Sequence, residues 1–218
     1  MDDVPVEQHA HWDAVYERKP EMFGKSPSAS AVHAAKRFRQ AGATRVLELG
    51  AGHGRDTLFF ASEGFRVTAL DYSVTGLHAL EATAAQAGLD DLIETREHDV
   101  RAPLPLPDGS VDAVYAHLLL CMALSTEEIA RLVEEVGRVL VPGGAFVYTV
   151  RNTSDAHYGV GIDHGDSIFE TQGYAVHFFD PALVDALAVG WNLEDVEPDE
   201  EGPLPRRIWR VTQTTPAM

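Results

Sequence analysis

Short runs of apolar and β-branched residues alternate along the chain with segments whose apolar residues repeat at helical spacing. The short runs predict strands, and they cover residues 44–49, 66–70, 92–97, 111–116 and 145–150. The helical pattern covers residues 56–63, 74–87 and 181–189. Strands that alternate with helices are typical of βα units, so we expect an α/β fold with a parallel sheet.

The clearest helix follows Ser125, which together with Glu128 forms the sequence of a capping box. Behind it, apolar residues recur at helical spacing up to the Pro142-Gly143-Gly144 turn, namely Ile129, Leu132, Val133, Val136, Val139 and Leu140. Towards the C-terminus, residues 193–196 and 207–212 predict a closing hairpin. Residues 1–43 have a helical pattern of mixed polarity and are interpreted as an N-terminal appendage, with the main domain at residues 44–218.

A glycine-rich turn, Gly50-Ala51-Gly52-His53-Gly54, lies between the first predicted strand and the helix that follows it. Glycines permit a tight turn there and let a ligand approach the backbone. A dinucleotide-binding fingerprint would need a small residue at position 55, where this chain has Arg55. Asp71 ends the second strand, and its carboxylate can accept hydrogen bonds from both hydroxyls of a ribose. The pattern therefore favours a ribose-bearing ligand without phosphates.

The charge of the chain narrows the choice of partners. Lys and Arg number 17 against 34 Asp and Glu, which gives a net charge of −17. Nucleic acid and anionic membranes are therefore poor candidate partners. The chain has no long apolar run and an acidic start, so we expect a cytoplasmic protein with no membrane span or secretory signal. Cys121 is the only cysteine, which excludes an internal disulfide and a multi-cysteine zinc site.

Taken together, the LELGAGHG segment, Asp71, the His98-Asp99-Val100 segment and the VLVPGG segment resemble the class I methyltransferases that use S-adenosylmethionine (SAM). The resemblance spans residues 44–150. It implies a Rossmann-like fold, with a mostly parallel seven-stranded sheet, an antiparallel last strand and helices on both faces. The turn Gly52-His53-Gly54-Arg55-Asp56 and an aromatic N-terminal segment look most like the small tellurite-resistance-like and thiol-methylating members.

The resemblance also implies a cofactor site. The glycines of the turn would lie beside the methionine part of SAM, Asp71 on the ribose and Asp99 on the adenine amino group. Glu48 would support the loop or meet the amino group of SAM, and His117 would lie near the methyl group. The expected cofactor residues are Trp12, Tyr16, Glu48, Gly50, Gly52, Gly54, Asp71, Tyr72, Asp99, Val100 and His117.

Structural alternatives remain open for several of these residues. Trp12 and Tyr16 resemble part of a lid over the cofactor, but side chains four residues apart are also an ordinary packing pair of a helix. Asp99 could merely begin a turn. His53 and His98 are interpreted as a variable loop residue and a structural residue rather than as catalysts.

Residues 151–177 are rich in Gly, His, Asp and aromatic residues, and they follow the fifth predicted strand. Long loops at the carboxyl edge of an α/β sheet form ligand crevices. The expected acceptor pocket comprises Arg151, His157, Tyr158, His177 and Arg206; alternatively, these side chains hold the loop together. His157, His164 and His177 match no closed pattern of metal ligands, so no metal is expected.

These observations predict an enzyme that transfers a methyl group from SAM to a small-molecule acceptor by in-line displacement, leaving S-adenosylhomocysteine (SAH). The acceptor is expected to be polar or anionic, with an O, S, N or metalloid oxyanion nucleophile. His117 or His177 could serve as a base or position the acceptor. A non-catalytic SAM-binding module stays an alternative, as does a nicotinamide-dependent oxidoreductase, which Arg55 and the PGG turn disfavour. The oligomeric state, monomer or homodimer, stays open.

Overall fold

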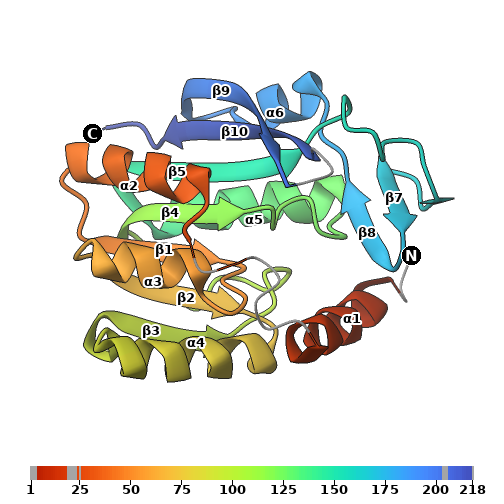
Figure 1. Ribbon diagram of the computed structural model, residues 1–218. Helices are drawn as coiled ribbons and strands as arrows, with labels where there is room; N and C mark the ends of the chain where they lie inside the picture. The colour runs from red at the N-terminus through yellow and green to blue at the C-terminus, as the bar shows by residue number, and fades with distance from the viewer. Residues whose placement is uncertain (1–3, 19–23, 25, 203–205, 218) are drawn as a thin grey trace.

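The computed structural model describes residues 4–18, 24, 26–202 and 206–217, and these form a seven-stranded sheet in the order β3-β2-β1-β4-β5-β10-β9 (Figure 1). All of these strands run parallel except β10, which is antiparallel to both of its neighbours. The strands are β1 (Arg45–Leu49), β2 (Arg66–Asp71), β3 (Ile93–Glu97), β4 (Val111–His117), β5 (Leu140–Arg151), β9 (Asn192–Glu201) and β10 (Arg206–Thr214). The predicted fold class is confirmed.

Helices cover both faces of this sheet, as expected for βα units (Figure 1). They are α1 (Val4–Arg18), α2 (Ala29–Gln40), α3 (Arg55–Ser62), α4 (Val74–Ala87), the short 3-10 helix η1 (Asp90–Leu92), α5 (Thr126–Val139) and α6 (Pro181–Leu187). Strand β5 begins earlier than predicted, because Leu140 already pairs with Val111 before the Pro142-Gly143-Gly144 segment.

Helix α5 shows how local sequence signals and core packing coincide. The Ser125 hydroxyl accepts the backbone N–H of Glu128, and the Glu128 carboxylate accepts the backbone N–H of Ser125, which completes the capping box. Its apolar residues are buried against the sheet, including Ile129 and Val136. The helix therefore follows the prediction up to Val139, while Leu140, which was expected in the helix, begins β5.

The predicted N-terminal appendage, residues 1–43, divides into two parts in the structure, apart from residues 1–3, 19–23 and 25, which lie outside the described residues. Helix α2 belongs to the main core, because Ala31 and Phe38 are fully buried beside Phe60 and Phe65. Helix α1 instead lies beside α4 and β8 at the carboxyl edge of the sheet (Figure 1). Only α1 is thus placed where a lid could act.

The segment that we predicted as an acceptor loop contains secondary structure of its own. Within the described part of the chain, a second sheet of three short antiparallel strands follows β5. Its strands are β6 (Ile162–Asp163), β7 (Ile168–Thr171) and β8 (Tyr174–His177). Sequence reasoning missed them because strands of two to four residues carry too little periodicity to be recognised.

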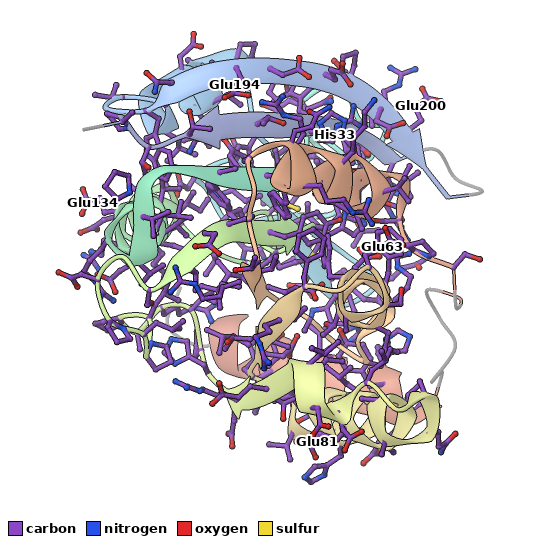
Figure 2. All side chains as sticks on the ribbon, turned by 90° about the vertical axis from the view of Figure 1, so that its left-hand side faces the viewer. His33, Glu63, Glu81, Glu134, Glu194 and Glu200 are labelled. Carbon is purple, nitrogen blue, oxygen red and sulfur yellow. The ribbon has the colours of Figure 1, made fainter. Side chains whose placement is uncertain are left out.

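The acidic side chains are spread around the molecule. Figure 2 shows Glu63 at the end of α3, Glu81 on α4, Glu134 on α5, and Glu194 and Glu200 on β9. These glutamates therefore come from helices and strands in different parts of the fold. Among the described residues, no helix is both long enough and apolar enough to cross a membrane.

Candidate active site

A cavity of about 380 Å³ lies at the carboxyl edge of the parallel strands. The glycine-rich turn after β1 forms one end, and residues of β5, β7, β8 and β10 form the other. Ligand sites of open α/β sheets lie at this edge. Its wall includes Trp12, Tyr16, Glu48, Gly50, Gly52, Arg55, Asp56, Asp71, Tyr72, Val100, Arg101, His117, Leu118, Leu119, Met122, Arg151, His157, Phe169, Tyr174, Val176, Phe178 and Arg206.

The glycine turn brings bare backbone to the cavity. Gly50 and Gly52 have positive φ angles of 73° and 55°, which favour glycine. A β-carbon on Gly52 would lie 2.6 Å from the Tyr16 hydroxyl, and one on Gly50 would lie 2.9 Å from Leu119 Cδ1. Gly54 does not line the cavity; it packs against Leu80 and precedes α3. Gly54 was expected beside the cofactor, but in the structure it allows close packing between the turn and α4.

Asp71 organises the turn from the end of β2. Its carboxylate accepts the backbone N–H of Gly52 at 2.7 Å and that of Ser73 at 2.8 Å. Burial raises the pKa of Asp71, although these two N–H groups act in the opposite direction. A carboxylate offers about four lone-pair sites, so two hydrogen bonds leave capacity for a ligand's hydroxyl groups. The position of Asp71 in the cavity wall fits its expected role on a ribose.

Glu48, on β1, is a second buried carboxylate in the cavity wall. It accepts a hydrogen bond from the Thr57 hydroxyl. Burial and the nearby Asp56 raise the pKa of Glu48 well above its usual range. A buried ionised carboxylate is costly unless a cation pairs with it. An ammonium group of a ligand would supply such a cation, so the residues present fit the amino group of SAM.

Asp56 is a site residue that the sequence analysis did not single out. It is buried and accepts hydrogen bonds from the backbone N–H and hydroxyl of Ser28, both at 2.8 Å, and from the Tyr115 hydroxyl at 3.2 Å. Arg55 pairs with it from the same turn. Asp56 therefore ties the start of α2 to α3 and β4 directly behind the cavity. No local signal could reveal this, since Ser28 and Tyr115 lie 28 and 59 residues from Asp56.

His117 ends β4 and lines the cavity, as expected, but both of its ring nitrogens lie beside protein groups. Nδ1 lies 2.9 Å from the Thr149 hydroxyl, which itself accepts the backbone N–H of Leu118. Nε2 lies 3.0 Å from Oε2 of Glu201, at the end of β9. This arrangement favours a positioning role for His117 over its expected role as a base. The contact with Glu201 was not predicted.

Arg151 lines the acceptor end of the cavity, where its charge is paired. Its Nε donates to Asp155 at 3.1 Å, a second guanidinium nitrogen contacts the other oxygen of Asp155, and the group lies over the Phe178 ring. Asp155 also accepts the backbone N–H groups of His157 and Arg207. Burial alone would raise the pKa of Asp155, but Arg151 and these N–H groups lower it. The alternative reading, that such residues hold the loop together, thus applies to Arg151.

Some expected site residues lie outside the cavity wall. His177 is 1% exposed, and its Nδ1 lies 2.7 Å from the carbonyl oxygen of Leu124. The residues on either side of it, Val176 and Phe178, do line the cavity. Because side chains alternate along an extended chain, His177 points the other way. It therefore supports the structure and is not placed to act as a base or to contact the acceptor.

Asp99 and Tyr158 also differ from expectation. The Asp99 carboxylate is half-exposed, pairs with Arg101 and accepts the backbone N–H of Arg101, so it begins a turn instead of lining the cavity. The Tyr158 ring packs against Phe169 and Phe178 from outside. His164, which we considered as a metal ligand, lies 2.9 Å from Glu170.

Helix α1 closes the cavity with Trp12 and Tyr16, whose ring centroids lie 5.7 Å apart. They pack against each other, as a helical pair four residues apart does, and they also line the cavity, as a lid would. Polar contacts fix the helix at two places. The Asp13 carboxylate accepts the Ser73 hydroxyl beside α4, and the Gln8 amide donates to the carbonyl of Gly173 before β8. Helix α1 therefore bridges the cofactor end and the acceptor end of the cavity.

The remaining expected residues lie in the wall of the cavity. They are Trp12, Tyr16, Glu48, Gly50, Gly52, Asp71, Tyr72, Val100, His117, Arg151, His157 and Arg206. The sequence analysis did not anticipate the apolar side, which is built by Leu119, Met122, Phe169, Tyr174, Val176 and Phe178. These residues come from the β4–α5 connection, from the small sheet, whose fold was not predicted, and from Phe178 directly after it.

Comparison with known proteins shows which family this chain is similar to. Residues 46–144 match a family model described as a methyltransferase domain. An uncharacterized methyltransferase of Mycobacterium tuberculosis is 40% identical over 119 residues, which cover 55% of this chain and 44% of the relative. This chain thus spans less than half the length of the first curated relatives that it matches. The similarity to tellurite-resistance-like members stays a prediction.

Two solved structures share the fold. The 1,6-didemethyltoxoflavin-N1-methyltransferase of Burkholderia thailandensis, solved with 1,6-didemethyltoxoflavin and SAH, has a TM-score of 0.73 at 18% identity and covers 97% of this chain and 88% of its own. The cyclase SpnF has a TM-score of 0.73 at 18% identity and covers 97% of both chains. Likeness at this level of identity shows the fold, and one fold can support different reactions.

The strand order of the sheet differs from that of the dinucleotide-binding fold, which the nicotinamide-dependent alternative would need. The Rossmann order 3-2-1-4-5-6 is built from parallel units, whereas here the antiparallel β10 lies between β5 and β9. Gly52, Asp71 and Glu48 meet at the end of the cavity where the resemblance places SAM. Over residues 46–144 the chain is therefore similar to methyltransferase domains, in agreement with the resemblance to class I enzymes that use SAM.

Proposed function

We propose that this protein transfers the methyl group of SAM to a small polar or anionic acceptor, leaving SAH. The observation that carries the proposal is the continuity of the cavity. It joins the glycine turn and Asp71 at one end to Arg151, His157 and Arg206 at the other. A cofactor at the first end and an acceptor at the second would thus share one enclosed space.

Bound SAM would supply a methyl group on a positively charged sulfur, ready for in-line displacement by a nucleophile. The chain's own residues would bind and orient the two partners, and positioning of this kind can account for much of the acceleration of such a reaction. Asp71 would hold the ribose and Glu48 the amino group. Trp12 and Tyr16, from α1, would keep water away.

The size and lining of the acceptor end support a small molecule as substrate. Phe169, Val176 and Phe178 form an apolar wall, and a few polar groups face it, an arrangement typical of small-molecule sites. The toxoflavin methyltransferase, which shares the fold, was solved with 1,6-didemethyltoxoflavin and SAH bound.

The test is the formation of SAH by the purified protein with SAM and a panel of small acceptors. We expect SAM to bind in calorimetry and NAD not to bind, and at least some acceptors to yield SAH. The matched control is the Gly52→Val variant, in which a side chain would occupy the bare backbone of the turn. Binding of SAM without turnover on any acceptor would favour the alternative, a non-catalytic SAM-binding module.

A further inference from the structure

The acceptor end of the cavity carries an uneven distribution of charge. Among the described residues, the carboxylates that line the cavity are Glu48, Asp56 and Asp71, and all belong to the end formed by β1, α3 and β2. The ionic and imidazole groups of the opposite end are Arg151, His157 and Arg206. Asp155 and Glu201 lie behind this wall and do not line it. A ligand at the acceptor end therefore faces the hydrogen-bond donors of Arg151, His157 and Arg206.

Arg206 differs from Arg151 in how its charge is used. Asp155 pairs with Arg151, whereas Arg206 forms no ion pair with any carboxylate of the residues that the structure describes. Glu201 lies opposite Arg206 in the β9–β10 ladder, but its oxygens contact His117 at 3.0 Å and Arg55 at 3.7 Å. The charge of Arg206 is thus available to a ligand in the cavity.

The sheet register places Arg206 close to Arg151. Ile208 lies directly opposite Arg151 in the β5–β10 pair, and Arg206 is two residues from Ile208. Directly opposite residues of an antiparallel pair point to the same face, as do residues two apart along a strand. Arg206 and Arg151 are therefore diagonal neighbours on one face, at a typical separation of roughly 7–8 Å.

His157 adds a fixed donor to this corner. Its Nδ1 lies 2.9 Å from a guanidinium nitrogen of Arg151, which is always a donor, and 3.4 Å from Oδ1 of Asp155. When Nδ1 accepts from Arg151, the hydrogen of a neutral imidazole lies on Nε2. Asp155 favours this arrangement, because it holds the Arg151 guanidinium beside the ring and accepts the backbone N–H of His157. Asp155 is therefore a positioning residue for the donor.

We propose that Arg206 and the Nε2–H of His157 form a carboxylate subsite, and that the methyl acceptor is a small organic acid whose apolar body lies against Phe169 and Phe178. This inference rests on the proposed function and names its substrate class. A planar guanidinium matches the geometry of a carboxylate. One available arginine suits a single negative charge better than a doubly charged phosphate monoester.

The experiment uses benzoate and cyclohexanecarboxylate as probes, their uncharged amides as matched ligands, and phenyl phosphate as the competing anion. Binding to the full chain is followed by ligand-observed NMR, with and without SAH. We expect each acid to bind at least about tenfold more tightly than its amide, since a hydrogen bond to a charged group commonly contributes a factor of this size. Acids and amides that bind alike, or phenyl phosphate that binds more tightly than benzoate, would overturn the assignment.

Variants locate the subsite. Arg206→Gln should weaken acid binding about 10- to 100-fold and leave SAH affinity unchanged. Arg207→Gln is the matched control, because Arg207 is the neighbouring residue, is exposed and contacts Glu200 and the Ser154 carbonyl instead. His157→Gln, whose amide can still donate, should retain more acid affinity than His157→Phe. Equal losses in the Arg206 and Arg207 variants, or loss of SAH affinity in the Arg206 variant, would contradict the subsite.

The two proposals can fail separately. Acid binding that depends on Arg206, without SAH formation from any acid, would retain the subsite and reject the proposed methyl transfer. Turnover of uncharged acceptors by a protein that does not bind the acids would retain the methyl transfer and reject the subsite. For the positioning role of Asp155, Asp155→Asn should lower acid affinity without changing SAH affinity; an unchanged acid affinity would reject that role.

Discussion

Nε2 of His117 lies 3.0 Å from Oε2 of Glu201, which joins the end of β4 to the end of β9. Arg55, directly after the glycine turn, lies 3.7 Å from the other oxygen of Glu201. Burial would raise the pKa of Glu201, but His117, Arg55 and the more distant charge of Arg206 together lower it to about 2. The C-terminal hairpin, which carries Arg206, is thus attached to the cofactor end of the cavity by this carboxylate.

This contact predicts a pH dependence of stability. The pKa of Glu201 falls from its usual 4.5 to about 2 on folding, so its contribution is present above 4.5 and is lost as the pH falls towards 2. Glu201→Gln should lower the free energy of unfolding at neutral pH by about 1 kcal/mol, a value reduced for partial exposure to solvent. Urea unfolding should show this difference shrinking below pH 4.5. Glu200→Gln, on the exposed neighbour, is the control; an equal effect there would refute the role of the contact.

Asp71 and Asp99 should differ in their effect on the cofactor. Asp71→Asn removes a carboxylate from the cavity wall and should weaken SAM binding by about 2 kcal/mol, the range of hydrogen bonds to charged groups. Asp99→Asn should leave SAM affinity unchanged, because the Asp99 carboxylate does not line the cavity and pairs with Arg101. Calorimetry measures both affinities, and thermal unfolding checks that each variant folds. Similar losses in the two variants would show that Asp99 also reaches the cofactor.

The approach of Tyr16 to Gly52 can be tested with a double-mutant cycle. Gly52→Ala should reduce SAM binding, since the new β-carbon would lie 2.6 Å from the Tyr16 hydroxyl and the residue has a φ of 55°. Tyr16→Phe removes that hydroxyl and should restore part of the affinity in the double variant. The backbone strain would remain, so recovery should be incomplete. Strictly additive effects would mean that α1 does not cover the turn when SAM binds.

His177 should affect stability and not the cofactor. His177→Ala leaves a cavity and removes the partner of the Leu124 carbonyl, and it should destabilise the protein by about 2–4 kcal/mol. SAM affinity should not change, because the side chain points away from the cavity. Urea unfolding and calorimetry measure the two quantities. A variant that is as stable as the original protein but has lost turnover would indicate that His177 contacts the acceptor.

Much of the fold could be predicted because its signals are local. The capping box at Ser125, the apolar spacing behind it and the Gly50 to Gly54 turn each act within a few residues, and all appear in the structure as expected. Asp71 was identified by its place at the end of a strand. Local signals left one choice open: Asp99 follows its strand at the expected position, and its side chain forms a turn with Arg101, which was the structural alternative.

The sequence by itself determined the βα units of the main sheet, the class of the fold and the position of the glycine turn and Asp71, because each depends on residues that are neighbours along the chain. Only the tertiary structure decided the rest. Ser28, Asp56 and Tyr115 meet from three separate elements, and His117 meets Glu201 across the sheet. His177 lies between two cavity residues and points the other way, since the direction of a side chain in a short strand depends on a register that the sequence does not reveal.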